Sequence, residues 1–270
     1  METIQRSETI RRGLLTAAGV AILLVAWTVV SALFFTNPSG TPGPVPQPLI
    51  VVAEVVRLLG RPATWAAIGA TTGSAATGFA IGVLIAIVLG VIVMLVPILE
   101  QFASQLGVIA ACLPAAAIAP LVVMLAPVGT RTVSVVLAVL AVLFPCVVGV
   151  LLGLRAATPA QLDVVAAFGG SRWTAVRTVR SIAAVPAVVA ALKIAAPSAM
   201  LGAIVGEYFI VGVDSGLGLL LVSKQYVADY AGMWAVAVIC ALVAGTGFAL
   251  VAIAGRVVAP WTDSGEGRTA

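Results

Sequence analysis

The sequence contains no histidine, and only 9% of its residues are charged. Without histidine there is no imidazole base, no imidazole proton relay and no histidine-ligated metal site. The three cysteines stand far apart in apolar stretches, where cysteine usually packs as a small hydrophobic residue, and they lack metal-ligand spacing. We therefore predict that this chain has no catalytic residues and binds no metal or cofactor of its own.

Hydrophobic residues make up 62% of the chain. A soluble domain carries about 25% charged residues, so this chain cannot cover a water-facing surface with polar groups. A spanning helix needs about 20 apolar residues, and the segments that qualify are 14–36, 66–96, 103–126, 132–153, 183–209 and 232–255. The sequence predicts an all-α, polytopic membrane protein with about six transmembrane helices. The first segment is too long for the core of a signal peptide, so we expect it to be retained.

Basic residues predict the orientation of the chain, because Lys and Arg mark the cytoplasmic side of a membrane protein. One set of loops carries Arg6, Arg11, Arg12, Arg155, Arg172, Arg177, Arg180, Arg256 and Arg268. The opposite set carries Arg57, Arg61, Arg131 and Lys224. The larger set places both termini in the cytoplasm.

The predicted organisation follows from the spans and the orientation. It comprises a cytoplasmic N-terminus (1–13), a first transmembrane helix (14–36), an extracytoplasmic loop with an interfacial helix (37–63), a core transmembrane domain (64–257) with a cytoplasmic loop (158–182), and a cytoplasmic tail (258–270). The interfacial helix is "LIVVAEVVRLL", which is too short to span the bilayer. Pro114 and Pro120 interrupt the third span, so we expect that span to be broken or kinked.

The cytoplasmic loop contains a charged stretch, "QLDVVAAFGGSRWTAVRTVR" at 161–180, inside an otherwise apolar chain. Thr158, Pro159 and Gln161 predict a helix start with a capping box. Gly169-Gly170 is typical of the left-handed turn that ends a helix, and Ser171 can cap a second helix that runs into the fifth span at Pro186. A solvated loop that only sets topology would need the charges but not the caps or the turn. Both interpretations, a solvated loop and a docking element for a cytoplasmic partner, remain open on these residues.

Pairs of small residues four apart recur in the spans: Gly69/Gly73, Gly78/Gly82, Gly149/Gly153 and Gly202/Gly206. Such pairs permit the close approach of two transmembrane helices. They also arise by chance in a glycine-rich membrane protein, so the sequence does not decide which of them form contacts.

The charged stretch resembles the EAA loop of ABC importer permeases. Asp163-Val164-Val165 stands where those proteins have Glu-Ala-Ala, and Gly169 follows at the required spacing. The segment "AAFGGSRW" is similar to a form found in permeases for nitrate, taurine, aliphatic sulfonates and thiamine precursors. Further blocks match in order over about residues 44–255, including "LPAAAIAPL" and "GEYFIVGVDSGLG". The sequence departs from the loop pattern where Ser181-Ile182 replaces Leu-Pro.

The resemblance implies a type I ABC importer permease fold in a bacterial plasma membrane. It implies a dimer of permeases, a homodimer or a pair with a paralogue, together with cytoplasmic ABC ATPase subunits and an extracytoplasmic substrate-binding protein. No phosphate-binding GxxxxGK[ST] motif occurs in this chain, so ATP and magnesium would be bound by the partner ATPase. The expected ATPase-coupling residues are Asp163, Ala166, Ala167, Gly169, Gly170, Ser171, Arg172 and Trp173.

The residues expected along the substrate pathway lie on the third and fifth spans. They are Pro114, Pro120, Met124, Ser198, Met200 and Glu207. Glu207 could line the outer cavity or contact the binding protein, or it could be a solvated carboxylate at a helix end. Lys193 lies within the fifth span, where a pathway role and a structural role with the side chain reaching toward water stay open.

Transport by an ATP-driven importer is the leading functional hypothesis, with a small solute such as a sulfonate, a nitrate-like anion or a pyrimidine vitamin precursor. A secondary transporter independent of ATP is the alternative. It usually needs internal repeats and intramembrane acids, which the sequence does not show. A membrane scaffold would have no use for a capped, hinged loop.

Overall fold

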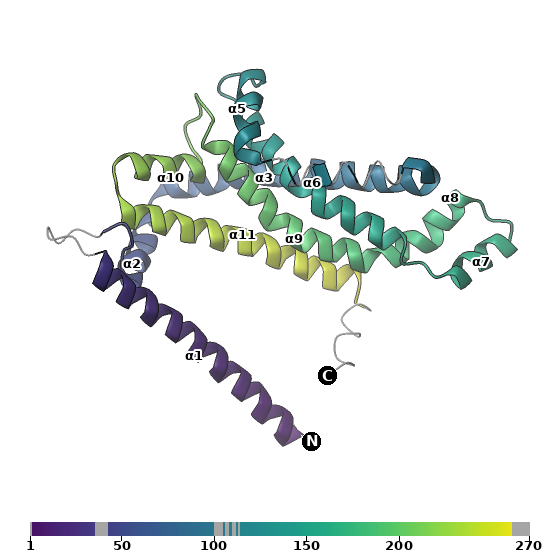
Figure 1. Cartoon of the computed structure of the whole chain (residues 1–270), viewed down its shortest axis with the longest axis horizontal. Coiled ribbons are helices and arrows are strands. Elements are labelled where there is room, and N and C mark those ends of the chain that lie inside the picture. The colour runs from purple at the N-terminus through teal and green to yellow at the C-terminus, as the bar shows by residue number, and fades with distance from the viewer. Residues whose placement is uncertain are drawn as a thin grey trace. The chain divides into compact units, whose positions relative to one another are not determined.

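The computed structural model describes residues 2–35, 43–99, 105, 108, 109, 112 and 114–260. These residues are almost entirely helical and contain no β-strand (Figure 1), which confirms the all-α prediction. The backbone forms two compact units, residues 1–64 with 221–239 and residues 65–220 with 240–270. Each unit is described by itself.

Aromatic and polar contacts connect the segments of the first unit. Its elements are α1 (Glu2–Phe34), α2 (Pro48–Leu59) and the beginning of α11 (Tyr230–Val258). The rings of Trp27 on α1 and Trp234 on α11 lie 5.1 Å apart, and Trp234 Nε1 donates a hydrogen bond to the carbonyl of Pro44 at 3.1 Å. Ser31 Oγ donates to the carbonyl of Val45 at 2.7 Å. The short helix predicted at 49–59 is confirmed by α2.

Asp229 organises the turn that enters α11. Its Oδ1 accepts the N–H of Gly232 at 2.9 Å, as expected of an N-cap residue, and its Oδ2 accepts from Lys224 Nζ at 2.7 Å. Partial burial disfavours the charged carboxylate, but the Lys224 and Gly232 hydrogen bonds outweigh it and hold the pKa of Asp229 below its ordinary value. The turn is therefore tied by an ion pair as well as by a cap.

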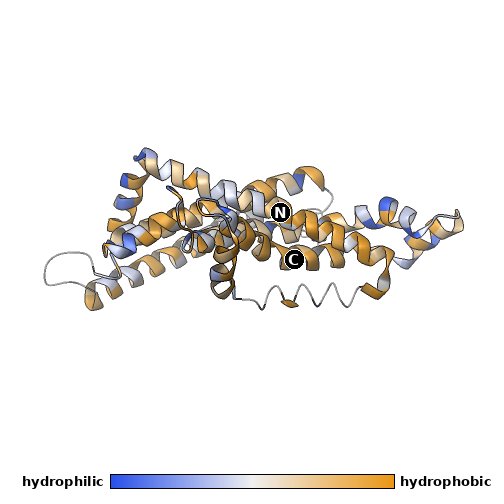
Figure 2. Cartoon of the chain, turned by 90° about the horizontal axis from the view of Figure 1, so that it is seen from above, coloured by the Kyte–Doolittle hydropathy of each residue, from blue (hydrophilic) through white to orange (hydrophobic). Residues whose placement is uncertain are grey.

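The second unit contains the remaining helices. They are α3 (Pro62–Leu95), η1 (Pro97–Leu99), α5 (Ala115–Leu125), α6 (Thr132–Leu154), α7 (Pro159–Ala167), α8 (Arg172–Ala175), the π-helical η2 (Val176–Arg180), α9 (Ser181–Glu207), the beginning of α10 (Leu217–Tyr226) and most of α11. Hydrophobic residues dominate the long helices, and the hydrophilic residues lie mostly in the shorter segments, α7 and α8 among them (Figure 2).

Five segments of the described chain are long and apolar enough to cross a membrane. They are Gly13–Phe34, Pro62–Leu95, Thr132–Leu154, Arg172–Glu207 and Tyr230–Val258. The remaining predicted span, the third (103–126), has much of its first half outside the described residues, and its second half is the shorter helix α5. Pro114 is the N-cap of α5, and Pro120 lies inside it.

The boundaries of several predicted segments differ from the observed helices. Helix α1 already begins at Glu2, so it includes most of the segment predicted as the N-terminus. Residue 36 at the end of the predicted first span, residues 37–42 of the first loop and residues 261–270 of the predicted tail lie outside the described residues. Helix α9 begins at Ser181, and Pro186, expected at the start of the fifth span, lies within it.

Helices α6 and α9 pack side by side through small residues at both ends of their contact (Figure 1). At one end, a Cβ atom placed on Gly202 of α9 would lie 2.5 Å from the carbonyl oxygen of Leu137. At the other end, a Cβ on Gly153 of α6 would lie 2.8 Å from the carbonyl oxygen of Ala184. In lipid, two helices gain little from excluding water, so close packing of this kind supplies much of the association energy.

Helix α3 also packs closely against α6 through glycine residues. A Cβ on Gly82 would lie 2.8 Å from a methyl carbon of Val142, and a Cβ on Gly78 would collide with Ala138. The pair Gly69/Gly73 on the same helix differs, because a Cβ on either residue would meet nothing within 4 Å. Of the four small-residue pairs in the sequence, therefore, the three other than Gly69/Gly73 form helix contacts within the second unit.

We predict that Gly202→Val destabilises the protein while Gly69→Val does not. The valine at 202 would force α6 and α9 apart, and overpacking of this kind costs about 1–3 kcal/mol, which corresponds to several degrees in Tm. The valine at 69 enters open space. Thermal unfolding of both variants in the same detergent measures the difference, and equal Tm values for the two variants would contradict the packing described.

Candidate functional site

The charged stretch forms a helical hairpin whose first helix, α7, begins with a capping box. Thr158 Oγ1 accepts the backbone N–H of Gln161 at 3.4 Å, and Gln161 Oε1 accepts the backbone N–H of Thr158 at 2.9 Å. Pro159 occupies the first helical position. The helix start predicted from the sequence is confirmed.

A glycine turn reverses the chain after α7. Gly169 has a φ of +71°, its N–H donates to the carbonyl of Ala166 at 2.9 Å, and the N–H of Gly170 donates to the carbonyl of Val165 at 2.8 Å. These two bonds together constitute a Schellman motif, which satisfies the last carbonyls of a helix. Ser171 Oγ then accepts the N–H of Thr174 at 3.2 Å and caps α8. Both predicted features, the turn and the second cap, are confirmed.

The tip of the hairpin exposes large apolar side chains. Phe168 is 90% exposed, and Val164 and Trp173 are more than half exposed. Most of the other expected coupling residues are exposed as well, namely Asp163, Ala166, Ala167, Gly169, Ser171 and Arg172, while Gly170 is half-buried. Exposed apolar groups concentrated on a rigid turn mark an interaction surface. Phe168 and Val164 were not among the coupling residues expected from the sequence. The position of Phe168 directly before Gly169-Gly170 could have indicated an exposed apolar residue at the turn.

The hairpin is continuous with a transmembrane helix. Helical structure runs without a break from Arg172 to Glu207 through α8, η2 and α9. The π turn of η2, which the sequence analysis did not predict, is a feature found often at functional sites. Arg180 at its end donates from Nη1 to the carbonyl of Leu154 at 3.3 Å and to Met94 Sδ at 2.9 Å. The base of the hairpin is thereby tied to the ends of α6 and α3.

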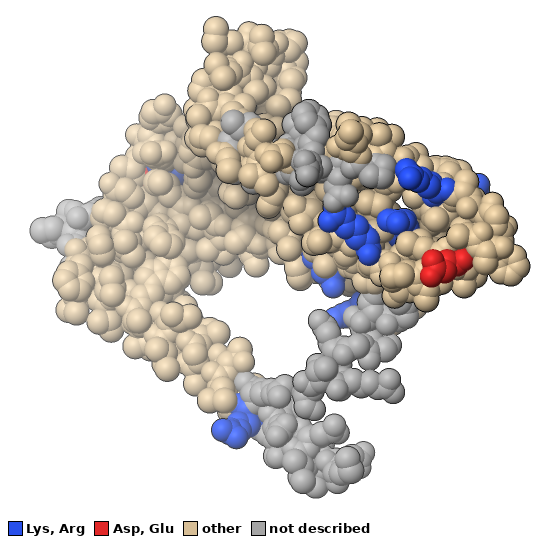
Figure 3. Space-filling view, turned by 45° about the vertical axis from the view of Figure 1, so that its right-hand side comes forward, with Lys and Arg blue, Asp and Glu red and all other residues tan. Residues whose placement is uncertain are grey.

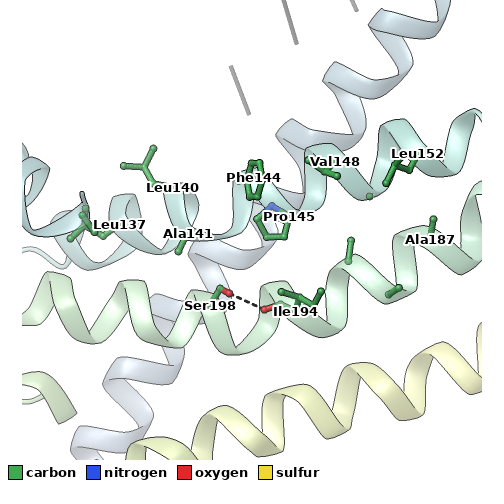
Figure 4. A pocket seen from close by; sticks show the side chains of 14 residues that line it. Leu137, Leu140, Ala141, Phe144, Pro145, Val148, Leu152, Ala187, Ile194 and Ser198 are labelled. Atoms are coloured by element: carbon green, nitrogen blue, oxygen red, sulfur yellow. Dashed lines mark hydrogen bonds between the residues drawn. The ribbon is translucent and has the colours of Figure 1, made fainter. Parts of the chain in front are cut away.

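A cavity of about 670 Å³ lies along α6 and α9 (Figure 4). Its lining residues are Ala115, Leu137, Leu140, Ala141, Phe144, Pro145, Val148, Gly149, Leu152, Ala187, Ala190, Ala191, Ile194 and Ser198. None of these side chains is charged, and Ser198 provides the one hydroxyl, which donates to the carbonyl of Ile194 at 2.9 Å. Pro145 lies inside α6 and has no backbone N–H, so the helical hydrogen-bond ladder lacks one donor beside the cavity.

Only some of the residues expected along the substrate pathway lie at this cavity. Ser198 lines the cavity, and Pro114 directly precedes the lining residue Ala115. Pro120 and Met124 lie elsewhere on α5, where Met124 is 83% exposed, and Met200 is buried in the packing of α9. Lys193 is half-buried on α9 outside the cavity lining.

Glu207 is fully buried, although it ends a helix. Its carboxylate lies 2.9 Å from Thr71 Oγ1 through both oxygens, 3.0 Å from Arg131 Nη1 and 2.8 Å from the N–H of Gly218. The structure therefore excludes a solvated helix-end carboxylate. A buried charge is tolerated only when it is paired and hydrogen-bonded, and these donors meet that requirement.

The Glu207 network joins segments that are far apart in the sequence. Thr71 is on α3, Arg131 precedes α6, and Gly218 is in the first turn of α10. Thr71 Oγ1 also accepts the N–H of Leu217 at 2.8 Å, and Arg131 Nη2 donates to the carbonyl of Ser215. Glu207 therefore fixes the loop that follows α9 to the helices around it.

The described residues offer no group of His, Cys, Asp or Glu side chains that could hold a metal ion. The hairpin exposes apolar side chains with a few charged ones beside them, and the cavity lining is apolar with one hydroxyl group.

Comparison with known proteins points to transport. Residues 78–264 match the family described as binding-protein-dependent transport system inner membrane component. A probable ABC transporter permease protein from Haemophilus influenzae is 37% identical over 129 residues, which is 48% of this chain and 48% of that protein. A riboflavin transport system permease protein from Chloroflexus aurantiacus is 29% identical over 265 residues, or 98% of this chain and 95% of that protein. The chain thus matches about half of the first relative and nearly all of the second.

We predict that Thr71→Val destabilises the protein and that Thr77→Val does not. The first change leaves the N–H of Leu217 without its acceptor and removes one partner from the buried carboxylate, which costs about 1–3 kcal/mol. Thr77 is an exposed residue of the same helix whose hydroxyl bonds only the carbonyl of Gly73 among the contacts described. Thermal unfolding in detergent compares the two variants. If Thr71→Val retains the wild-type Tm, the network does not hold the loop.

Proposed function

Because the chain belongs to the family of inner-membrane components of binding-protein-dependent transport systems, we propose that it is the permease subunit of an ATP-driven importer. The family consists of transport permeases rather than enzymes, and the apolar spans make the chain an integral membrane protein. In this proposal an extracytoplasmic binding protein delivers a small solute, this chain carries it across the membrane, and a separate ATPase subunit binds ATP and magnesium. In this proposal both termini and the hairpin lie on the cytoplasmic side, which the distribution of basic residues favours.

The observation that carries this function is the hairpin of α7 and α8 at the end of the continuous helix Arg172–Glu207. A cytoplasmic ATPase can hold Phe168 and Val164 in an apolar cleft, with Asp163 and Arg172 available for charge pairing at its edge. A movement of the docked hairpin would be transmitted directly to α9, which forms one wall of the cavity. Coupling through two arrangements of packed helices is the usual form of alternating access.

A second permease copy, or a close paralogue, completes the pathway in this proposal. The cavity is lined by α6 and α9 with one residue of α5, so one chain supplies part of its wall. Two permease chains would also present two hairpins, one for each ATPase subunit.

The lining of the cavity favours an uncharged organic solute over an inorganic anion. A nitrate or sulfonate group is normally bound by charged donors, and burying it without them costs several kcal/mol. An aromatic ring can instead pack on Phe144 and form a hydrogen bond with Ser198. Among the solute classes considered, a pyrimidine-type vitamin precursor fits best. The relative that matches nearly the whole chain is a riboflavin transport system permease, which supports a heterocyclic solute.

We predict that Gly169→Val abolishes uptake whereas Gly169→Asn largely preserves it. A Cβ at this position meets nothing within 4 Å, so the constraint is the positive φ rather than space. Asparagine adopts left-handed backbone angles readily and β-branched valine does not. ATPase co-purification and solute uptake by the assembled transporter measure the effect, and membrane insertion should be unchanged because it depends on apolar length.

The same comparison tests the coupling role of the hairpin. If Gly169→Val inserts normally and keeps wild-type ATPase binding and uptake, then the hairpin is not the coupling element. If Gly169→Asn fails together with Gly169→Val while both insert normally, the requirement is for the absence of a side chain rather than for the left-handed turn.

We predict that cells expressing the complete transporter take up a labelled flavin or pyrimidine in preference to labelled taurine or nitrate. Ser198→Ala should weaken that uptake several-fold, because it removes the one side-chain hydroxyl of the cavity. Ser223→Ala, on α10 and outside the cavity lining, is the matched control. Transport of taurine or nitrate alone would overturn the assignment of solute class and leave the permease function intact.

A further inference from the structure

A second cavity, of about 540 Å³, lies on the other side of the α6–α9 pair and shares no lining residue with the first. It is bounded by α3, α6, α9 and α11, and its walls are aliphatic except for Phe79 and the hydroxyl of Ser181. A polar solute would find almost no hydrogen-bond partner there. In a bilayer such a space is filled by hydrocarbon, because an empty cavity forfeits the dispersion contacts of its lining.

The length of this groove along α3 is close to the hydrocarbon thickness of one leaflet. Its residues on α3 run from Phe79 to Val91, about 18 Å at the rise of an α-helix. Half of the hydrocarbon core of a bilayer is about 15 Å. A single acyl chain lying along α3 would therefore extend from the end of the groove near η2 to the middle of the membrane.

Basic residues surround the end of the groove nearest the hairpin. Four lining residues, Leu154, Val176, Ser181 and Gly255, are each adjacent in sequence to an arginine. Those arginines are Arg155, Arg177, Arg180 and Arg256. From residue 150 to residue 192 the one acidic residue is Asp163, which is exposed on α7. Figure 3 shows basic side chains gathered around this end of the unit, with one small acidic patch.

Arg180 is held in place at this end of the groove. Its Nη1 donates to the carbonyl of Leu154 and to Met94 Sδ, and Leu154 is itself a lining residue. Arg177, close to one turn earlier in η2, is exposed. Guanidinium groups bind phosphate through paired hydrogen bonds, and basic pockets between transmembrane helices on the cytoplasmic side bind anionic headgroups.

We propose that this groove is a binding site for one anionic phospholipid of the cytoplasmic leaflet. The acyl chain lies against α3, α9 and α11, and the phosphate is bound by Arg177 and Arg180. The choice of leaflet rests on the orientation in the proposed function, while the site itself does not depend on transport. The lipid would occupy the junction between the hairpin and α9, where it can influence how the hairpin moves.

The test measures lipid retained by the purified chain in detergent by native mass spectrometry, with phosphatidylglycerol or phosphatidylcholine added at equal concentrations. We expect the wild type to retain phosphatidylglycerol at least several-fold better. Arg177→Gln should lower phosphatidylglycerol binding about fivefold, the effect of one basic residue near an anionic lipid. Ala254→Phe, which fills the groove, should lower the binding of both lipids.

Two controls separate a site from general attraction. Arg172→Gln removes a nearby exposed arginine that does not adjoin the groove, and it should leave phosphatidylglycerol binding unchanged. Gly169→Val should also retain the lipid even where uptake is lost. The lipid-site proposal and the coupling hypothesis can therefore fail independently of each other. Ala254→Leu is the milder filling variant if Ala254→Phe does not elute as folded protein.

Three outcomes would overturn the proposal. One is equal retention of the two lipids by the wild type. Another is an equal loss of phosphatidylglycerol in Arg172→Gln and Arg177→Gln, which would indicate non-specific attraction to a basic surface. The third is undiminished binding in a folded variant whose groove is filled.

Discussion

The close contact between α6 and α9 is the constraint on which the rest of the second unit depends. Gly149 and Gly153 on one helix and Gly202 and Gly206 on the other let the backbones approach at both ends of the interface. Because the two helices are in contact along their length, the spaces beside them become two separate cavities. The cavity on one side of the pair is the one proposed to bind the solute, and the cavity on the other side is the groove proposed to bind a lipid. The same helix pair also joins the hairpin at one end to Glu207 at the other.

Glu207 shows how a charged residue is accommodated in an apolar protein. Its burial would be prohibitive if the carboxylate were alone, and removing one partner of a buried pair typically costs about 3–5 kcal/mol. Arg131, Thr71 and the N–H of Gly218 supply the required donors. The donors that stabilise the carboxylate also connect α3, the start of α6 and the start of α10, so the same contacts position the loop after α9.

Features that are local in sequence could be predicted, and features that depend on distant contacts could not. The capping box at Thr158, the turn at Gly169 and the cap at Ser171 are set by residues within a few positions of each other, and the structure confirms all three. The spans followed from apolar length. By contrast, Glu207 could not be assigned from the sequence, since Thr71 and Arg131 lie far from it along the chain.

Tertiary packing also determines which glycine pairs form helix contacts and which residues of α9 line the cavity. Gly69/Gly73 and Gly202/Gly206 have the same spacing, but a neighbouring helix lies only against the second pair. Of the expected pathway residues Ser198 reached the cavity, whereas Met200, two positions later on the same helix, is buried in its packing. Two positions are about 200° around an α-helix, so such residues face opposite directions. Which direction leads to a cavity depends on the neighbouring helices.

The π turn of η2 has a geometric consequence for the permease. A π turn accommodates one more residue than an α turn, and one residue corresponds to about 100° of rotation around an α-helix. Val176–Arg180 therefore sets the angular phase between the face that carries Trp173 and the face that carries Ser198. If this turn were regular α-helix, the residues on both faces would be the same, but the face that carries Trp173 would be rotated relative to the face that carries Ser198. If the hairpin is the coupling element, this one additional residue sets the direction in which its movement reaches the face of α9 that lines the cavity.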